Sequence, residues 1–382
     1  MKIFCILMFF CSGAFAYTSE QVLKTAWSDR TYLSYDEIQP TGSRNPLRNV
    51  EGVLSQEQNG SAEVEVGLKF QFKSWPEWTG KKGQGNEQKL LKETSLGWAL
   101  RSRYNTLLLV ELNSQKLKCV EEALHLSELY IQAQSLSLRA GRGTSKSFLS
   151  AKSDLYKLQR TQNALRQEKE ILEKRVKTWV PEIKDRSLVG LELVQVDDIS
   201  QLLQGHYPNG DSLSRKIANE EIEQMGQELE IVKGREKQWF KAVEVSQTRK
   251  DDETRYKVEL TVQIPGLGSD DLAKQKQNEL ILKRALKQRD LEESGDQLQS
   301  LKVQILNLVD IYRKTKKMEK ISVGTLDSLA NIERKITQQQ EQLDLLNQQQ
   351  EITSLYLDYL LESEILLKAP NKNYLDKRQG EI

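Results

Sequence analysis

The sequence predicts a mainly α-helical protein built from two structural repeats, each with a β-hairpin and two long antiparallel helices that form coiled coils. Three observations predict this fold class. Two long stretches contain no proline, apolar residues recur there with heptad spacing, and two short segments alternate apolar and polar residues as strands do. Pro76 and Pro181, which bound the first stretch, are as far apart as Pro265 and Pro370, which bound the second. This equal spacing indicates a duplicated plan.

Residues 1–16 have the pattern of a secretory signal peptide. Lys2 supplies the positive charge, Ile3 to Phe10 form the apolar run, and Ala14-Phe15-Ala16 is a small-x-small cleavage site. We therefore expect an exported protein whose mature chain begins near Tyr17.

The composition excludes several classes of protein. The chain has 56 basic and 55 acidic residues, and loss of Lys2 with the signal makes the two numbers equal. This balance of charge disfavours nucleic acid as a partner. Cys119 is the only cysteine after the signal, so no internal disulfide is expected. A hydrophobic content of 38% is low for large cores but suits long helices that bury a narrow stripe. No stretch after the signal approaches the length of an apolar transmembrane helix.

The first repeat, residues 17–180, is expected to open with a helix from Ser19 to Tyr35 and a β-hairpin at about 48–73. The turn Asn59-Gly60 lies between a weakly patterned strand, Arg48 to Glu57, and a clearly alternating one, Glu63 to Lys73. The apolar residues of the second strand, which all point one way, are Val64, Val66, Leu68, Phe70 and Phe72.

Two long helices are predicted to follow, from Glu87 to Ala140 and from Asp154 to Val180, because both segments are rich in good helix formers. Gly141-Arg142-Gly143-Thr144 separates them, since a tight turn between helices needs glycine. The first helix would be about 80 Å long at about 1.5 Å per residue, which requires a coiled coil or a tubular assembly. The second carries apolar residues at heptad spacing, namely Leu155, Leu158, Leu165, Leu172, Val176 and Trp179.

The second repeat, residues 209–370, follows the same order. A helix from Asp211 to Trp239 leads to a hairpin at about 239–264, whose second strand alternates from Thr254 to Ile264. Its apolar residues are Tyr256, Val258, Leu260, Val262 and Ile264. Two helices with heptad spacing follow and are separated by a turn at Gly324-Thr325.

Residues outside the repeats are expected to be a connector and a tail. The connector, residues 181–208, contains short apolar groups and is predicted to be ordered without forming a domain. The tail, residues 371–382, is polar and is predicted to be loose.

The sequence contains little evidence for an enzyme. The two histidines, His125 and His206, lack the spacing of metal ligands, and the GxG strings Gly141-Arg-Gly143 and Gly266-Leu-Gly268 lack the strand and helix context of phosphate loops. Cys119 lies on a predicted helix as a small packing residue. We therefore expect no catalytic site, metal or cofactor.

The export signal, the duplicated helices and the strands that end near proline together resemble the TolC family of outer membrane efflux proteins. Val258-Glu-Leu-Thr-Val-Gln-Ile-Pro265 is similar to the strand that exits through proline in that family. Gly141 followed by Phe148-Leu149-Ser150-Ala151 is similar to its helical turn motif, with Ser147 in place of the usual aspartate. The second turn, Val323 to Leu329, keeps glycine, threonine and aspartate but is shorter.

The resemblance implies a homotrimer whose protomers each give four strands to a 12-stranded β-barrel in outer membrane lipid, with helices forming a tunnel through the periplasm of a Gram-negative bacterium. It implies a passive conduit for efflux or type I secretion, opened by a periplasmic membrane-fusion adaptor and energised by an inner membrane transporter. The adaptor would contact the helical turns at Gly141, Gly143, Thr144, Gly324, Thr325 and Asp327.

The strands can be compared with the dimensions of a membrane. A strand from Glu63 to Lys73, tilted near 45°, rises about 26 Å, and a barrel's apolar band is about 25 Å high. We therefore expect the apolar residues of both strands to face lipid, with Trp75, Trp78 and Trp239 as interfacial residues. The alternative is a periplasmic helical stalk or adaptor-like structural protein that does not span the outer membrane.

Overall fold

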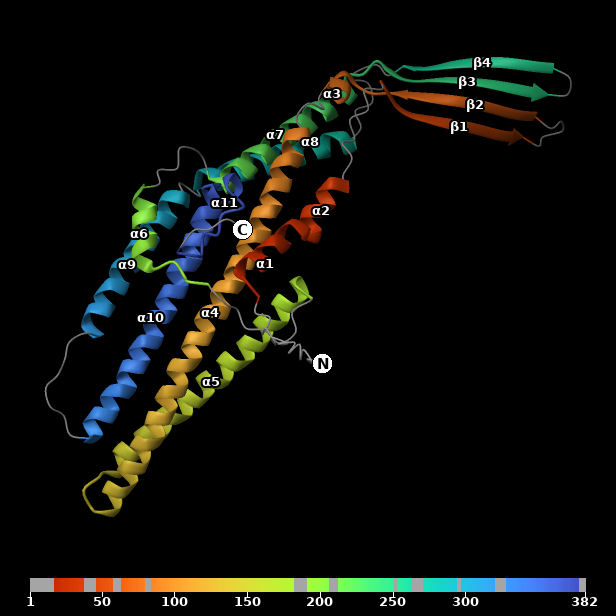
Figure 1. Cartoon of the computed structure of the whole chain (residues 1–382). Coiled ribbons are helices and arrows are strands. Elements are labelled where there is room, and N and C mark those ends of the chain that lie inside the picture. Colours follow the sequence, from red (N-terminus) through yellow and green to blue (C-terminus); the bar gives the residue numbers. More distant parts are fainter. Residues whose placement is uncertain are drawn as a thin grey trace, which may run out of the picture. The chain divides into compact units, whose positions relative to one another are not determined.

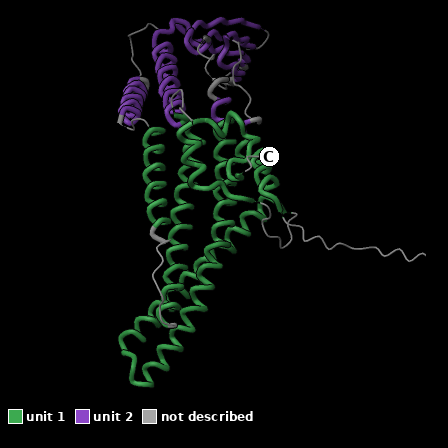
Figure 2. Tube along the Cα trace, turned by 60° about the vertical axis from the view of Figure 1, so that its left-hand side comes forward, with its two compact units in different colours: residues 1–34, 93–213, 296–382 green, residues 35–92, 214–295 purple. Residues whose placement is uncertain are grey.

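A computed structural model describes residues 17–37, 46–57, 63–79, 84–181, 191–205, 212–250, 253–262, 271–293, 297–319 and 328–377. The predicted signal peptide lies outside these residues. The chain divides into two compact units, one made of residues 1–34, 93–213 and 296–382 and the other of residues 35–92 and 214–295 (Figure 2).

The first unit is built from long helices packed side by side. Its main helices are α4 (Gln84–Arg139, which begins in the second unit), α5 (Ser145–Trp179), α9 (Gln297–Glu319) and α10 (Ser328–Glu362). Helix α5 returns antiparallel to α4 (Figure 1). Shorter elements complete the unit: α1 (Ser19–Lys24), a 3-10 turn (Thr25–Ser28), the start of α2 (Arg30–Glu37), α6 (Val196–Gly205) and α11 (Ile365–Lys368).

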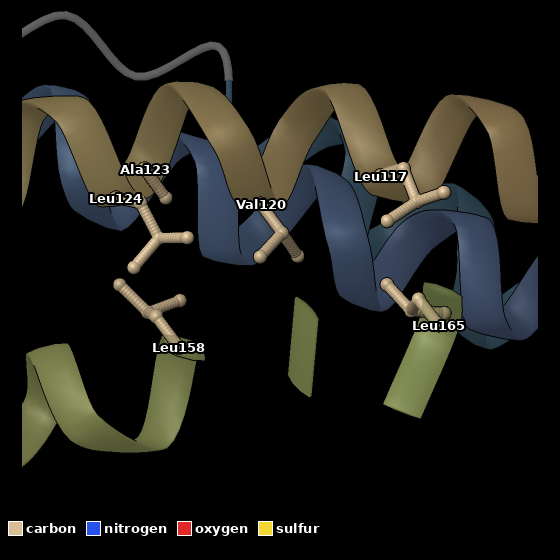
Figure 3. Close-up of a cluster of buried hydrophobic side chains, with 6 residues drawn as sticks. All are labelled: Leu117, Val120, Ala123, Leu124, Leu158 and Leu165. Atoms are coloured by element: carbon tan, nitrogen blue, oxygen red, sulfur yellow. The ribbon is translucent and has the colours of Figure 1, made fainter. Parts of the chain in front are cut away.

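The interface between α4 and α5 is a narrow apolar seam. Leu117, Val120, Ala123 and Leu124 of α4 meet Leu158 and Leu165 of α5 (Figure 3). Leu155 of α5 and Leu343 of α10 are partly buried against this cluster. The buried residues of α5 recur every seven positions from Ala151 through Leu172, as the heptad pattern predicts. Helix α5 begins earlier than the predicted Asp154, because the Thr144 hydroxyl caps it by accepting a hydrogen bond from the Ser147 amide at 3.2 Å.

The C-terminal segment up to residue 377 is packed, which corrects the prediction of a loose tail there. Asn373, Tyr374 and Leu375 are buried, and the Asn373 amide donates a hydrogen bond to the Ser19 hydroxyl at 3.0 Å. The Tyr104 hydroxyl of α4 donates to the Lys372 carbonyl at 2.6 Å. Two large apolar side chains within a polar sequence gain enough from burial to order the segment. Residues 378–382 lie outside the described part.

The described part of the connector is also ordered and pairs with this segment. Leu193 forms an antiparallel β-bridge with Asp376, and the Val194 amide donates to the Leu375 carbonyl at 2.8 Å. Helix α6 then buries Val196, Ile199 and Leu203 within the first unit. The prediction that residues 181–208 form an ordered connector is tested only at residues 181 and 191–205.

The second unit combines a β-sheet with helices. Its strands are β1 (Leu47–Glu57), β2 (Glu63–Phe72), β3 (Phe240–Lys250) and β4 (Glu253–Val262), and its helices are α3 (Trp75–Thr79), α7 (Leu213–Glu236) and α8 (Asp271–Glu293). Leu229 and Val232 of α7 pack on Leu280 of α8. Ion pairs from Lys276 to Glu228 at 2.9 Å and from Lys287 to Glu221 at 2.7 Å show that α7 and α8 run antiparallel.

The predicted fold class is confirmed in its helices and in its two β-hairpins, one from each repeat. Within the described part of the chain, no helix combines the length and the apolar character that crossing a lipid bilayer requires.

Candidate functional site

The two hairpins join into a single four-stranded antiparallel sheet in the order β1-β2-β3-β4 (Figure 1). Strands β2 and β3 are far apart in sequence, yet they pair over their length, with Leu68 opposite Val245 and Phe70 opposite Val243. Residues that lie directly opposite each other on antiparallel strands project to the same face of the sheet. The register therefore assigns every paired residue to one of two faces.

One face of this sheet, here called the apolar face, collects the strand residues that the sequence predicts to face lipid. Val66, Leu68, Phe70 and Phe72 share it with Tyr256, Val258, Leu260 and Val262, because Val245 pairs with both Leu68 and Val258. Most of these side chains are exposed, including Val66 at 55% and Val258 at 69%. Val64 lies in β2, and Ile264 lies outside the described residues.

The register adds apolar residues that the sequence pattern missed. Leu54 and Val50 of β1 lie opposite Val66 and Phe70, and Val243 and Val245 of β3 lie on the same face. Farther along β3, Gln247 and Arg249 are polar residues on this face. Strand β1 has a weak alternation because Gly52 occupies an apolar-face position. The alternation of Val243 and Val245 is the signal that would have identified the face of β3 from sequence.

The opposite face, here called the polar face, is charged. Among residues with described side chains, acidic residues outnumber basic ones there: Glu51, Glu65, Glu244, Glu253 and Glu259 against Lys69, Arg255 and Lys257. Ser246 is buried on this face and donates to Glu65 at 2.6 Å. Position 67, opposite Ser246, requires glycine, because a Cβ there would lie 2.8 Å from the Ser246 Cβ.

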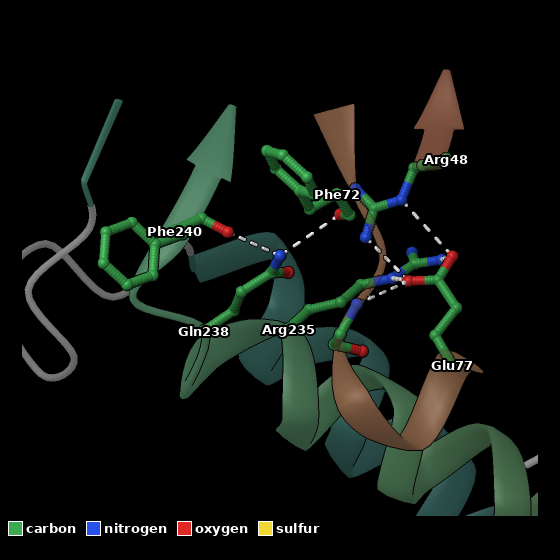
Figure 4. Close-up of polar contacts among 7 residues, drawn as sticks. Arg48, Phe72, Glu77, Arg235, Gln238 and Phe240 are labelled. Carbon is green, nitrogen blue, oxygen red and sulfur yellow. Dashed lines mark hydrogen bonds and ion pairs between the residues drawn. The ribbon is translucent and has the colours of Figure 1, made fainter. Parts of the chain in front are cut away.

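A half-buried carboxylate links the two repeats where the strands leave the sheet (Figure 4). Glu77 of α3 pairs with Arg48 of β1 at 2.7 Å and with Arg235 of α7 at 3.0 Å, while its own side chain is 12% exposed. Partial burial opposes ionisation of Glu77, but hydrogen bonds from the two arginines and their charges outweigh it and lower the pKa to about 2. We call these three residues the Glu77 clasp.

A second contact holds the two central strands at the same end. The Gln238 amide nitrogen donates to the carbonyl of Phe72, the last residue of β2, at 3.1 Å. It also donates to the carbonyl of Phe240, the first residue of β3, at 2.6 Å (Figure 4). One side chain therefore satisfies both strand ends and sets where β2 and β3 separate.

The turn between α4 and α5 contains the other site residues that the structure describes. Gly141 has φ +72°, the left-handed conformation that favours glycine. Its amide donates to the Leu138 carbonyl at 3.0 Å and the Arg142 amide donates to the Ser137 carbonyl at 3.0 Å, which together form a Schellman cap. A Cβ on Gly143 would lie 3.0 Å from the Leu138 amide nitrogen.

The remaining predicted site residues, Gly324, Thr325 and Asp327, lie outside the described part of the chain, as does His206. His125 is exposed on α4 and Cys119 is buried there. Burial raises the pKa of the Cys119 thiol, as does the nearby charge of Glu122. The described residues contain no group of three or more His, Cys, Asp or Glu side chains arranged to hold a metal ion.

Comparison with known proteins identifies this fold. No protein-family model and no curated protein matches the sequence. Among solved structures, CusC matches with a TM-score of 0.55 and 12% identity over 90% of this chain and 91% of that chain. The CusC structures concern the conformational changes that accompany its folding and transmembrane channel formation. The Campylobacter jejuni outer membrane channel CmeC matches with a TM-score of 0.52 and 13% identity, over 90% and 84% of the two chains. A membrane protein from Pseudomonas aeruginosa matches at 0.50 and 11%, over 92% and 91%.

The chain thus has the fold of TolC-type outer membrane channels over nearly its whole length. This confirms the resemblance that the sequence motifs indicate. At these low identities the likeness establishes the fold, and function is argued from the sheet and the helical turn.

Proposed function

We propose that this chain is the outer membrane channel of a tripartite efflux or type I secretion system in a Gram-negative bacterium. A homotrimer would form a passive conduit across the outer membrane and periplasm, opened by a periplasmic adaptor and served by an inner membrane transporter. The observation that carries the proposal is the single sheet formed by both repeats, with an exposed apolar face opposite a charged face.

The two faces match the two environments of a membrane channel wall. Exposed valine, leucine and tyrosine side chains on a water-facing surface would cost free energy, whereas lipid accepts them. The glutamate and lysine side chains of the polar face need water, which the lumen of a channel supplies. Strands β1 and β3 have 11 residues each, so a tilt near 45° gives a height of about 26 Å, close to the apolar band of a barrel.

Closure of the sheet requires further copies of the chain. Strands β1 and β4 are the edges of the sheet, and unpaired edge groups are not tolerated in the hydrocarbon of a membrane. Three antiparallel pairings separate β1 from β4, so the β4 of one copy runs antiparallel to the β1 of the next. Copies can therefore close a ring with the same pairing throughout, and the proposed number of copies, three, is the one that the family resemblance implies.

The turn around Gly141, Gly143 and Thr144 is the proposed adaptor contact. Its surface is basic, because Arg139, Arg142 and Lys146 lie there and no acidic residue occurs from position 136 to 153. Leu136 and Leu149 are 65% and 63% exposed. A partner surface with acidic and apolar side chains would complement this turn. Contacts at Gly324, Thr325 and Asp327 remain part of the proposal.

Planar-bilayer recording on the purified protein tests this function, with a matched pair of variants. Val258→Arg adds a charge on the apolar face, and Thr261→Arg adds the same charge on the polar face of the same strand. We expect channels from the wild type and Thr261→Arg, and far fewer from Val258→Arg, because an arginine facing mid-membrane lipid costs about 2–4 kcal/mol. A wild-type protein that fractionates as a soluble monomer and gives no conductance would refute the channel and support the periplasmic stalk.

A further inference from the structure

A groove of about 750 Å³ opens where the two central strands leave the sheet. The end of β2, the start of α3, the end of α7 and the start of β3 form its walls. Four of its lining side chains are aromatic: Phe72, Trp75, Trp239 and Phe240. The volume lies in the range of sites that hold a small organic ligand.

The groove is continuous with the apolar face. Phe72 and Val243 belong to both, so a ligand whose chains cover the apolar face reaches the groove without crossing a polar barrier. Trp75, Trp239 and Phe240 are 70%, 59% and 56% exposed. Large aromatic side chains exposed at the end of an apolar band are typical of the boundary between hydrocarbon and water.

The polar side chains of the groove favour an anion. Lys73 and Lys237 line it, and none of the described residues that line it carries a carboxylate. The nearby Glu77 carboxylate is engaged by Arg48 and Arg235, so its charge is already compensated. The Ser74 side chain also lines the groove, and its buried hydroxyl oxygen has no hydrogen-bond partner among the described residues.

We propose that this groove binds an anionic glycerophospholipid from the membrane leaflet. Its phosphate would lie near Lys73 and Lys237, its glycerol region against the aromatic walls, and its acyl chains along the apolar face beside Val243. A phospholipid can contact both the two lysines of the groove and the adjoining apolar face. A soluble anion would contact only the lysines, and a purely apolar ligand would contact only the apolar face. The inference rests on the proposed function, since that function brings the sheet into lipid.

Native mass spectrometry of the full-length protein tests the proposal. The detergent-solubilised protein is incubated with equal amounts of phosphatidylglycerol and phosphatidylcholine, and the retained lipids are counted. Wild type should retain phosphatidylglycerol in preference by about tenfold, because two lysines favour a headgroup with a net negative charge over the zwitterionic headgroup of phosphatidylcholine. The double variant Lys73→Gln/Lys237→Gln should lose this preference, and Lys237→Gln alone, an exposed change that the fold will tolerate, should weaken it about threefold.

The control is Lys69→Gln/Lys257→Gln, which removes the same charge from the polar face of the same sheet and should retain the wild-type preference. Trp239→Ala should reduce retention of both lipids equally. Equal retention of the two lipids by the wild type, or a preference that survives in Lys73→Gln/Lys237→Gln, would overturn the proposal.

Recordings in bilayers of phosphatidylcholine alone separate this inference from the channel itself. Channels there without any lipid preference in the mass spectra would overturn the groove but leave the channel. Lipid preference in detergent without conductance in any bilayer would overturn the channel but support the groove.

Discussion

Replacing Glu77 with glutamine removes the negative charge of the clasp while keeping the size of the side chain. The fall of the Glu77 pKa from 4.5 to about 2 corresponds to about 3 kcal/mol of stabilisation. Arg48 and Arg235 are 36% and 49% exposed, so solvent screening reduces this figure. We therefore expect Glu77→Gln to lower the free energy of unfolding by about 1–2 kcal/mol at neutral pH.

The dependence on pH follows from the direction of the shift. A depressed pKa in the folded state gives a contribution that is complete above about pH 4.5 and is lost as the pH falls towards 2. The difference in stability between wild type and Glu77→Gln should therefore shrink across that window.

Urea unfolding monitored by tryptophan fluorescence between pH 2 and 7 measures this difference, and hydrogen exchange over residues 72–78 locates it. The control is Glu230→Gln on α7, where an exposed carboxylate pairs with Lys233 at 3.3 Å and should contribute little. A Glu77→Gln variant as stable as wild type at pH 7, or a difference independent of pH, would refute the electrostatic account of the clasp.

Two further predictions concern the helical unit. Gly141→Ala should destabilise the α4–α5 turn by about 1–2 kcal/mol, and Gly141→Asn should destabilise it by less. A Cβ at this position meets no atom within 4 Å, so the cost is the strain of the left-handed backbone alone. Hydrogen exchange at residues 137–147 measures both variants, and equal effects would contradict this reason. Tyr104→Phe should cost about 1–2 kcal/mol and expose the C-terminal segment to proteolysis, because it leaves the Lys372 carbonyl without its donor. Tyr156→Phe, at an exposed tyrosine, is the control and should change nothing.

Features that depend only on neighbouring residues in the chain could be predicted from the sequence. Alternation in β2 and β4 predicted which residues share a side of each strand, because the strand period is two and needs no tertiary information. Heptad spacing predicted the buried stripe of α5, and Gly141 predicted the turn. The start of α5 was misplaced because the capping role of Thr144 depends on a single side-chain hydrogen bond.

Features that depend on distant partners needed the tertiary structure. The pairing of β2 with β3 joins segments from different repeats, and neither strand carries a local signal that names its partner. The ion pairs of Glu77 also carry no local signal, because its two arginine partners come from β1 and α7. The groove likewise depends on tertiary structure, because its lining residues Phe72 and Trp239 come from different repeats. The packing of Tyr374 and Leu375 was missed for this reason also, because a short polar segment becomes ordered only when a core is present to receive its few apolar side chains.

The sequence by itself therefore determined the kind of each main element and the two-sided character of its strands, because local periodicity encodes both. The tertiary structure alone decided that the two hairpins form one sheet, which residues of β1 and β3 complete its apolar face, and where its strands are clasped. These features depend on contacts between residues far apart in the chain. Such contacts stabilise the protein only after the fold has brought the residues together, which costs chain entropy.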